Sequence, residues 1–237
     1  MRSLLAAIGF LTRIPVPAWA FEDTGASSAS LAWYPIVGLM VGGALSGLAW
    51  LGHALPPLLA AALLLLVWVG LTGALHLDGL ADSADAWVGG LGDRGRTLMI
   101  MKDPRSGPMG VTAVVLLLLV KFAALASMSL AGTAIWLAPM LARTAITAAF
   151  LCTPYVRSQG LGSALAQAPR LACAASVLAT VAAAACSEWH GVRALLAVLV
   201  VFACWRFACM RRLGGMTGDT LGALTELAEA AVLVVLV

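Results

Sequence analysis

Long apolar segments separated by short polar ones dominate the chain. A helix needs about 20 mostly apolar residues to cross a bilayer, and the segments that approach this length are Leu31–Leu51, Leu55–Leu75, Met109–Leu130, Thr133–Leu151, Leu171–Ser187, Val192–Met210 and Leu221–Val237. The last segment is the least typical, because it contains Glu226 and Glu229. The pattern predicts an all-α, polytopic integral membrane helix bundle with about seven transmembrane helices.

The N-terminal apolar run, Leu4–Leu11, is too short to span the hydrocarbon layer. Arg13, Pro15 and Pro17 follow it directly. A cleaved signal peptide ending near Ala20 is the alternative, but the apolar run is short for one. We therefore expect an amphipathic or re-entrant helix at the inner membrane surface.

The composition agrees with a membrane protein. Of the 237 residues, 62% are hydrophobic and 11% are charged, whereas soluble domains contain about 45–50% and about 25%. At this length we expect one integral domain over residues 1–237. The net charge of +3 does not indicate nucleic-acid binding. The five cysteines lie in or beside apolar segments without CxxC spacing, so we interpret them as reduced packing residues.

The positions of Lys and Arg predict the orientation in the membrane. With a cytoplasmic N-terminus, eleven of these cations lie on or near the inner side, Arg193 lies outside, and Lys121 and Arg143 lie within spans. The polar segments His76–Pro108 and Arg211–Thr220 then face the cytoplasm. Polar chemistry concentrated on one face favours an enzyme supplied from the cytosol over a transporter.

Two Gly-xxx-Gly spacings occur in the first predicted span, Gly38 with Gly42 and Gly43 with Gly47. Such spacings allow helices to approach closely in lipid. We expect packing within the chain rather than a dimer interface, and the sequence specifies no oligomeric state.

Three aspartates in HLDGLADSADAWVGG, Asp78, Asp82 and Asp85, are spaced by four and three residues. On a helix these spacings return to one face. Like charges one turn apart repel, and the first cation after them is Arg94. A hard divalent cation with oxygen ligands, such as Mg²⁺, would neutralise them. A solvated acidic face is the alternative.

A second acidic group follows the glycine-rich turn at Gly214–Gly218. Asp219 is placed to cap the last helix, and Glu226 and Glu229 share a face with it. Ionisable residues inside a span are functional by default. The alternative is that either glutamate pairs structurally with Lys121 or Arg143, the cations inside spans.

The segment MKDPRSGPMG lies between the two acidic groups. Lys102 and Arg105 suit an anionic phosphate, and the glycine-rich backbone around Gly107 allows N–H groups to approach phosphate oxygens. Basic residues that merely flank a span are the alternative. Together the acidic groups and cations fit phosphoryl transfer, in which positioning and charge stabilisation do most of the work.

These segments, with FLTRIPVP at Phe10–Pro17 and YPIVGLMVG at Tyr34–Gly42, resemble the cobalamin synthase family of adenosylcobinamide-GDP ribazoletransferases. The resembling blocks keep the family's order and cover most of the chain. The resemblance implies a Mg²⁺-dependent enzyme of the bacterial inner membrane, multi-pass, with a cytoplasmic active site. It would join adenosylcobinamide-GDP to α-ribazole, or its 5′-phosphate, and release GMP late in cobalamin biosynthesis.

The resemblance also assigns roles to residues. Asp78, Asp82 and Asp85 match a metal-binding signature similar to that of CDP-alcohol phosphotransferases. Asp82, Asp85 and Asp103 are the candidate proton acceptors for the attacking ribose hydroxyl. The expected substrate-binding residues are Lys102, Arg105, Gly107, Thr217, Gly218, Asp219 and Glu226. Asp219 and Glu226 would hold a second ion or orient the ribazole.

Two positions depart from the family pattern. Ala86 stands where a glycine is usual, and Pro104 stands where a serine is common, which removes one backbone donor.

Two other functions are alternatives. A CDP-alcohol phosphatidyltransferase would continue its signature with an Ala-Arg pair and end in G-x-x-x-D-x-x-x-D, and this chain does not. A proton- or cation-coupled transporter would use Glu226 and Glu229 as a proton or cation relay. It predicts internal repeats and polar residues on both faces, and the sequence shows neither.

Overall fold

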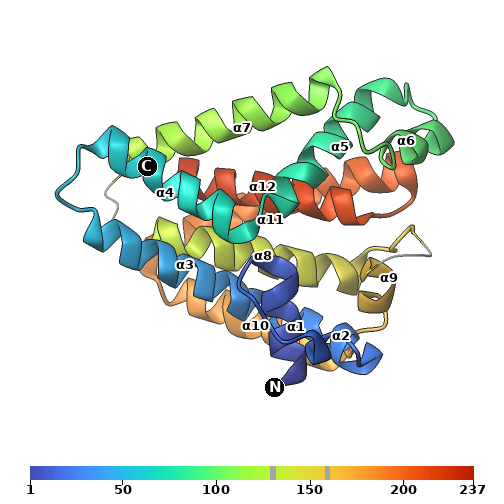
Figure 1. The fold of residues 1–237 in the computed structure, drawn as a ribbon, viewed down its shortest axis with the longest axis horizontal. Coiled ribbons are helices and arrows are strands. Elements are labelled where there is room, and N and C mark those ends of the chain that lie inside the picture. Colours follow the sequence, from blue (N-terminus) through green and yellow to red (C-terminus); the bar gives the residue numbers. More distant parts are fainter. Residues whose placement is uncertain (129–131, 158–160) are drawn as a thin grey trace.

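In the computed structural model, which describes residues 1–128, 132–157 and 161–237, the long helices run roughly along one axis (Figure 1). The elements are α1 (Arg2–Leu11), η1 (Ala18–Ala20), α2 (Thr24–Ala29), η2 (Ser30–Trp33), α3 (Tyr34–Leu51), α4 (Pro57–Thr72), α5 (Leu75–Gly89), α6 (Arg94–Ile100), α7 (Pro108–Ser127), α8 (Ala134–Cys152), α9 (Leu161–Leu165), α10 (Arg170–Ala185), α11 (Glu188–Leu213) and α12 (Gly218–Val235). Each predicted span coincides with one long helix. The predicted end of one span at Leu130 lies outside the described residues.

The chain is an all-helical, polytopic membrane protein. Among the described residues, four helical stretches are long and apolar enough to cross a membrane, namely Thr24–Leu51, α7, α8 and α11. A fifth is present if α4 and α5, which meet at an angle of 87°, form one broken span. The other two predicted spans are α10, which has 16 residues, and α12, which carries three acidic side chains.

Helix α8 forms the centre of the bundle, where it packs against α3, α10, α11 and α12. It approaches α3 closely, because a Cβ atom added to Gly38 would lie 2.4 Å from the Pro139 carbonyl oxygen and one added to Gly42 would lie 2.5 Å from the Trp136 Cα. This confirms packing within the chain for the first glycine pair. Gly43 and Gly47 have no neighbouring atom within 4 Å of such a Cβ atom.

The sharp turn between α4 and α5 sets the direction of the acidic helix. Gly73 and Ala74 both adopt left-handed backbone angles, with φ of 61° and 56°, which end α4. The N-terminal segment supports this turn, since the backbone N–H of Arg13 donates to the Leu71 carbonyl over 2.7 Å. Helix α5 therefore leaves α4 nearly at a right angle and extends toward α6 at one end of the bundle (Figure 1).

The N-terminal run forms the short helix α1, as expected, and packs on α2 and η2. All five cysteines are free thiols. The packing interpretation holds for Cys173 and Cys209, which are buried, whereas Cys152, Cys186 and Cys204 are exposed on the protein surface.

Candidate active site

The two acidic segments meet where α5 crosses α12. The crossing is close because two glycines face each other. A Cβ atom on Gly79 would lie 2.7 Å from the Asp219 carbonyl oxygen, and one on Gly222 would lie 3.3 Å from the Gly79 Cα. Any larger residue at Gly79 would push the helices apart. The glycines thus bring the first turns of α12 against the aspartate face of α5.

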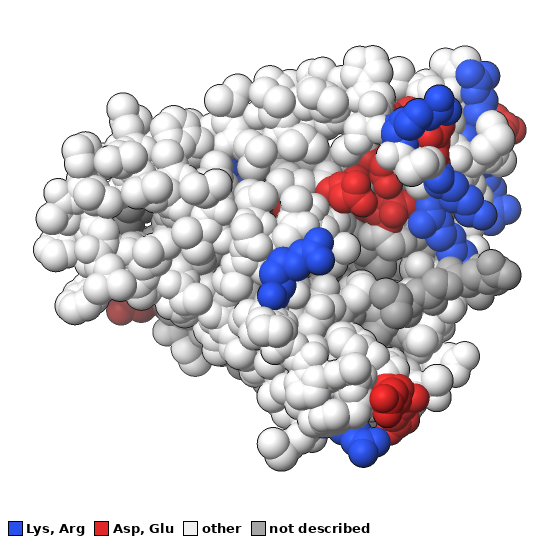
Figure 2. All heavy atoms as spheres, viewed as in Figure 1, with Lys and Arg blue, Asp and Glu red and all other residues white. Residues whose placement is uncertain are grey.

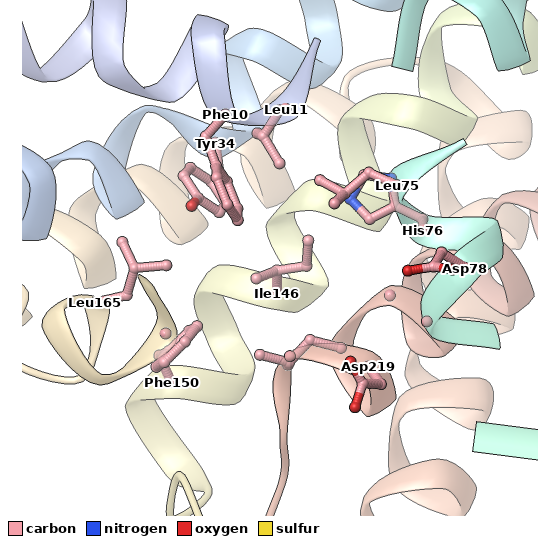
Figure 3. Close-up of a pocket in the computed structure, with 15 residues that line it drawn as sticks. Phe10, Leu11, Tyr34, Leu75, His76, Asp78, Ile146, Phe150, Leu165 and Asp219 are labelled. Carbon is pink, nitrogen blue, oxygen red and sulfur yellow. The ribbon is translucent and has the colours of Figure 1, made fainter. Parts of the chain in front are cut away.

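Three carboxylates gather at this crossing, Asp78, Asp82 and Asp219, and we call them the site acids. Asp78 and Asp219 line the same cavity (Figure 3). Asp82 lies within electrostatic range of both and of Asp85. Figure 2 shows acidic side chains gathered next to basic ones near the end of the molecule occupied by α5 and α6. The prediction that distant acidic segments converge is confirmed for Asp219.

Arg157, which the sequence analysis did not single out, is the cation nearest to the site acids. Its guanidinium donates to the Asp219 carboxylate over 2.6 Å and to the Met101 carbonyl over 3.3 Å. Its buried Nε atom has no hydrogen-bond partner within the described part of the chain. The signal available in the sequence was weak, namely that Arg157 follows a span on the same predicted face as the acidic segments.

The start of α12 corrects one expectation. Thr217, not Asp219, caps the helix, because the Thr217 and Thr220 side chains each accept the other residue's backbone N–H. Thr217 is fully buried, and its hydroxyl contacts the Met101 sulfur. Asp219 is freed from capping and instead pairs with Arg157. Gly218 is exposed and lines the cavity beside it.

Asp85 occupies a different position from the other two aspartates of α5. Its carboxylate accepts the backbone N–H groups of Gly107 over 2.6 Å and Gly110 over 2.9 Å. It thereby caps the N-terminus of α7, where unsatisfied N–H groups favour negative charge. The predicted phosphate-binding N–H of Gly107 is engaged in the same contact. Asp85 and Gly107 therefore hold the loop before α7 against α5.

Within that loop, Arg105 and Asp103 form a local pair. The Arg105 guanidinium donates two hydrogen bonds to the Asp103 carboxylate over 3.0 and 2.8 Å and lowers the pKa of Asp103 to about 2. A carboxylate with so low a pKa is a weak base at neutral pH. Lys102 is exposed beside this pair, and so is Pro104. The geometry favours Asp103 as a group that orients Arg105.

Other cations at this end hold the helix ends together. Arg94 donates to the Leu213 carbonyl over 2.7 Å, and Arg212 donates to the Trp87 carbonyl over 2.8 Å. Ala86, which replaces the family's glycine, is fully buried and packs among Met101 and Leu213. The methyl group is therefore accommodated in the core next to the site.

Glu226 and Glu229 lie away from the site acids, inside the bundle. Lys121 donates to Glu226 over 2.6 Å and to Glu229 over 2.5 Å, and Arg143 donates to Glu229. All four side chains are at most 6% exposed. We call these residues the buried ion network. It realises the structural pairing that the sequence left open, and it joins α7, α8 and α12.

No three His, Cys, Asp or Glu side chains in the described ranges are close enough to hold a metal ion among themselves. The side-chain carboxylates of Asp78 and Asp82 make no hydrogen bond or ion pair with any described residue. Their oxygen donors fit Mg²⁺, which is usually held by one or two carboxylates together with substrate phosphates and water. The Mg²⁺ expectation is therefore carried forward as a proposal.

The fold and the site together define a polytopic membrane protein with an acidic, cation-flanked site at one end of its helix bundle. The family model described as cobalamin-5-phosphate synthase matches residues 3–237. No solved structure matches the chain.

Curated relatives extend over the full length of the chain. A protein of Pseudomonas paraeruginosa is 52% identical over 239 residues, covering 100% of this chain and 98% of its own. One of Stutzerimonas stutzeri is 52% identical over 237 residues, covering 99% and 97%. Both are named adenosylcobinamide-GDP ribazoletransferase. The chain therefore belongs to the cobalamin-5-phosphate synthase family and is a transferase of cobalamin synthesis, which decides against the transporter alternative.

Proposed function

We propose that the protein joins adenosylcobinamide-GDP to α-ribazole, or to α-ribazole 5′-phosphate, and releases GMP. The observation that carries this proposal is the crossing at Gly79 and Gly222, which brings Asp78 and Asp82 of α5 to Asp219 of α12. The names of the relatives indicate the donor and the ribazole acceptor. A diphosphate-linked donor suits a site that combines carboxylates with Arg157, Lys102 and Arg105.

The reaction exchanges the P–O–P bond of the donor's diphosphate for a phosphodiester bond to the ribose. The ribose 3′-hydroxyl oxygen of the ribazole attacks the phosphorus that is attached to the cobinamide. A new P–O bond forms to the ribose, the bond from this phosphorus to the bridging oxygen breaks, and that oxygen leaves with GMP. The hydroxyl proton passes to a carboxylate. Enzymes accelerate such a transfer mainly by positioning and by stabilising charge.

Asp82 is the carboxylate best suited to accept that proton. Asp85 already accepts two backbone N–H groups, and Asp103 is neutralised by Arg105. Asp82 is only half-buried and has no such partner among the described residues. Asp78 and Asp219 then orient the reacting groups at the cavity.

The cations balance charge on the donor. Arg157 reaches the site from the loop after α8 and keeps its Nε free within the described chain. Lys102 and Arg105 are exposed on the loop before α7, where Arg105 can bind phosphate through two N–H groups and Lys102 as a point charge. These residues hold the diphosphate in place while GMP departs.

Mg²⁺ is proposed as the cofactor, held by Asp78 and Asp82 with substrate phosphate oxygens and, at a second position, by Asp219. Bound Mg²⁺ would supply charge neutralisation of the diphosphate. The carboxylates of Asp78 and Asp82 have no partner among the described residues. They support this proposal, because without a cation they repel each other.

We also propose that the site faces the cytoplasm from the bacterial inner membrane. The loops at this end carry Lys102, Arg105 and Arg157, and the last turn of α11 carries Arg211 and Arg212. This is the distribution expected for a cytoplasmic face.

The direct test is release of GMP from adenosylcobinamide-GDP by the purified protein in lipid nanodiscs. Release is expected only when α-ribazole and Mg²⁺ are both added, and EDTA is expected to stop it until excess Mg²⁺ is restored. GMP release without α-ribazole, with no corrinoid–ribazole product, would indicate a hydrolase instead. Undiminished transfer in EDTA would remove the proposed cofactor.

A further inference from the structure

An apolar cavity of about 160 Å³ lies beside the site acids. It lies between α1, α3, α5, α8, α9 and α12 (Figure 1). Figure 3 shows Asp78 and Asp219 at one side, with Phe10, Tyr34, Phe150 and Leu165 at the other. We call this cavity the aromatic pocket. Its lining is mainly aromatic and aliphatic and ends at two carboxylates.

The aromatic pocket contains one buried polar side chain with an unmet hydrogen bond. His76 lines the cavity and is 4% exposed. Its Nδ1 atom has no partner within the described part of the chain. Buried polar atoms are nearly always paired, and leaving one unpaired is unfavourable. Nδ1 is enclosed by the protein, so a ligand in the cavity would reach the imidazole through its other ring nitrogen, Nε2.

Resting on the proposed function, we infer that the aromatic pocket binds the base of α-ribazole and directs its ribose toward Asp78 and Asp219. This base is a flat bicyclic aromatic ring system with methyl groups and one free ring nitrogen. The rings match Phe10, Tyr34 and Phe150, since aromatic rings stack favourably on one another. The free nitrogen is an acceptor that suits an N–H group of the His76 imidazole, which lines the cavity.

The residues that line the aromatic pocket favour binding of the α-ribazole base over binding of the donor's guanine. Guanine carries an amino group, a carbonyl and several ring nitrogens, all of which need partners when buried. Apart from its carboxylate edge, the pocket offers mainly aromatic and aliphatic side chains and one histidine. A base with a single polar atom is satisfied there, whereas guanine is not. The guanosine end of the donor therefore binds outside the aromatic pocket.

The first test uses two matched variants. Phe150→Leu removes an aromatic ring from the pocket wall, and Phe207→Leu makes the same change on the exposed surface of α11. Phe150→Leu is expected to raise KM for α-ribazole about tenfold, with kcat and KM for adenosylcobinamide-GDP within about twofold of wild type. Phe207→Leu is expected to match wild type. A rise in KM for the corrinoid instead, or no rise in either KM, would overturn the inference.

The second test uses the wild-type protein, so it does not depend on folding of a variant. Free 5,6-dimethylbenzimidazole is expected to inhibit competitively against α-ribazole and not against adenosylcobinamide-GDP. Guanosine competing with α-ribazole would overturn the inference.

The two proposals can fail separately. If the protein releases no GMP, the proposed function fails. Binding of radiolabelled α-ribazole then tests whether the aromatic pocket binds the base. Binding to wild type that weakens about tenfold in Phe150→Leu supports the pocket, and absence of binding overturns it. If transfer occurs but Phe150→Leu changes only the corrinoid KM, the function stands and the pocket assignment falls.

Discussion

Helix α12 carries acidic residues in two settings that differ in their countercharges. At its N-terminus, Asp219 meets Asp78 and Asp82, and Arg157 is the cation paired with this group among the described residues. Farther along, Glu226 and Glu229 meet Lys121 and Arg143, so two negative charges face two positive ones. The first group is partly exposed and has more negative than positive charges. The second group is buried, and its negative and positive charges are equal in number.

The difference indicates two roles on α12: Asp219 belongs to the candidate site, whereas Glu226 and Glu229 hold the helix in the bundle. Charges inside a membrane protein are tolerated when they are paired within the bundle, and the buried ion network ties α7 and α8 to α12 in this way. Among the site acids, Asp78 and Asp82 have carboxylates without a described partner, and these are available to the proposed cation or substrate. The glutamates of α12 therefore hold the helix that presents Asp219.

The largest effect is expected from Asp82→Asn. This substitution removes the charge of a site acid, and it breaks no hydrogen bond or ion pair with the described residues. Transfer activity should fall at least about 100-fold, because the proton acceptor and one metal ligand are lost. The thermal unfolding midpoint should stay close to that of wild type. Activity in nanodiscs and unfolding are measured side by side, with Glu22→Gln, an exposed loop residue, as the control. Wild-type turnover in Asp82→Asn would contradict the role given to the site acids.

Glu229→Gln should show the opposite pattern. It leaves Arg143 buried without its countercharge and removes one partner of Lys121, which is expected to destabilise the fold by about 3 kcal/mol. The folded fraction should keep most of its turnover. Reversible unfolding in mixed micelles gives the free energy, with Glu188→Gln, exposed at the start of α11, for comparison. Full stability with abolished turnover would place Glu229 among the catalytic groups instead.

Asp85→Asn tests whether Asp85 stabilises the fold or belongs to the candidate site. An asparagine can accept one of the two N–H groups at the start of α7 but presents its own amide donor to the other. Stability should fall by about 1–2 kcal/mol and activity by about tenfold through displacement of the loop. If activity disappears as in Asp82→Asn while stability is unchanged, Asp85 is a metal ligand, as its position in the signature implies.

The smallest effect is expected from Asp103→Asn. Because its pKa is lowered to about 2, Asp103 is ionised throughout the neutral range. Its contribution to stability is present above its ordinary pKa of about 3.9 and is lost only as the pH falls through about 2. The substitution should lower activity about threefold by releasing Arg105 and leave the shape of the pH–rate profile between about pH 6 and 9 unchanged. Loss of a limb of that profile would identify Asp103 as the base.

The sequence predicted much of this architecture because its signals are local. Apolar length located α3, α4, α7, α8, α10, α11 and α12. The spacing of Asp78, Asp82 and Asp85 placed them on one helix, α5. The left-handed pair at Gly73 and Ala74 was not predicted, since alanine gives no warning of such backbone angles. The predicted span therefore extended to Leu75, whereas α4 ends at Thr72.

The parts that the sequence did not predict depend on tertiary contacts. Arg157 reaches Asp219 across 62 positions, and no periodicity signals that pair. Thr217 and Asp219 were both reasonable caps by residue type, and the bond to Arg157 decides between them. The pairing of Glu226 and Glu229 with cations was an open alternative because the order of helices in the bundle determines which charges meet.

Iron-mediated cleavage tests most directly whether the two acidic segments line one divalent-metal site. The nanodisc-embedded protein is incubated with Fe²⁺ and ascorbate in place of Mg²⁺, and the cut sites are mapped by mass spectrometry. Two cuts are expected, one near Asp78–Asp82 and one near Asp219, both suppressed by excess Mg²⁺ and both weakened in Asp82→Asn. A cut confined to one segment, or cuts that Mg²⁺ does not suppress, would contradict a shared site.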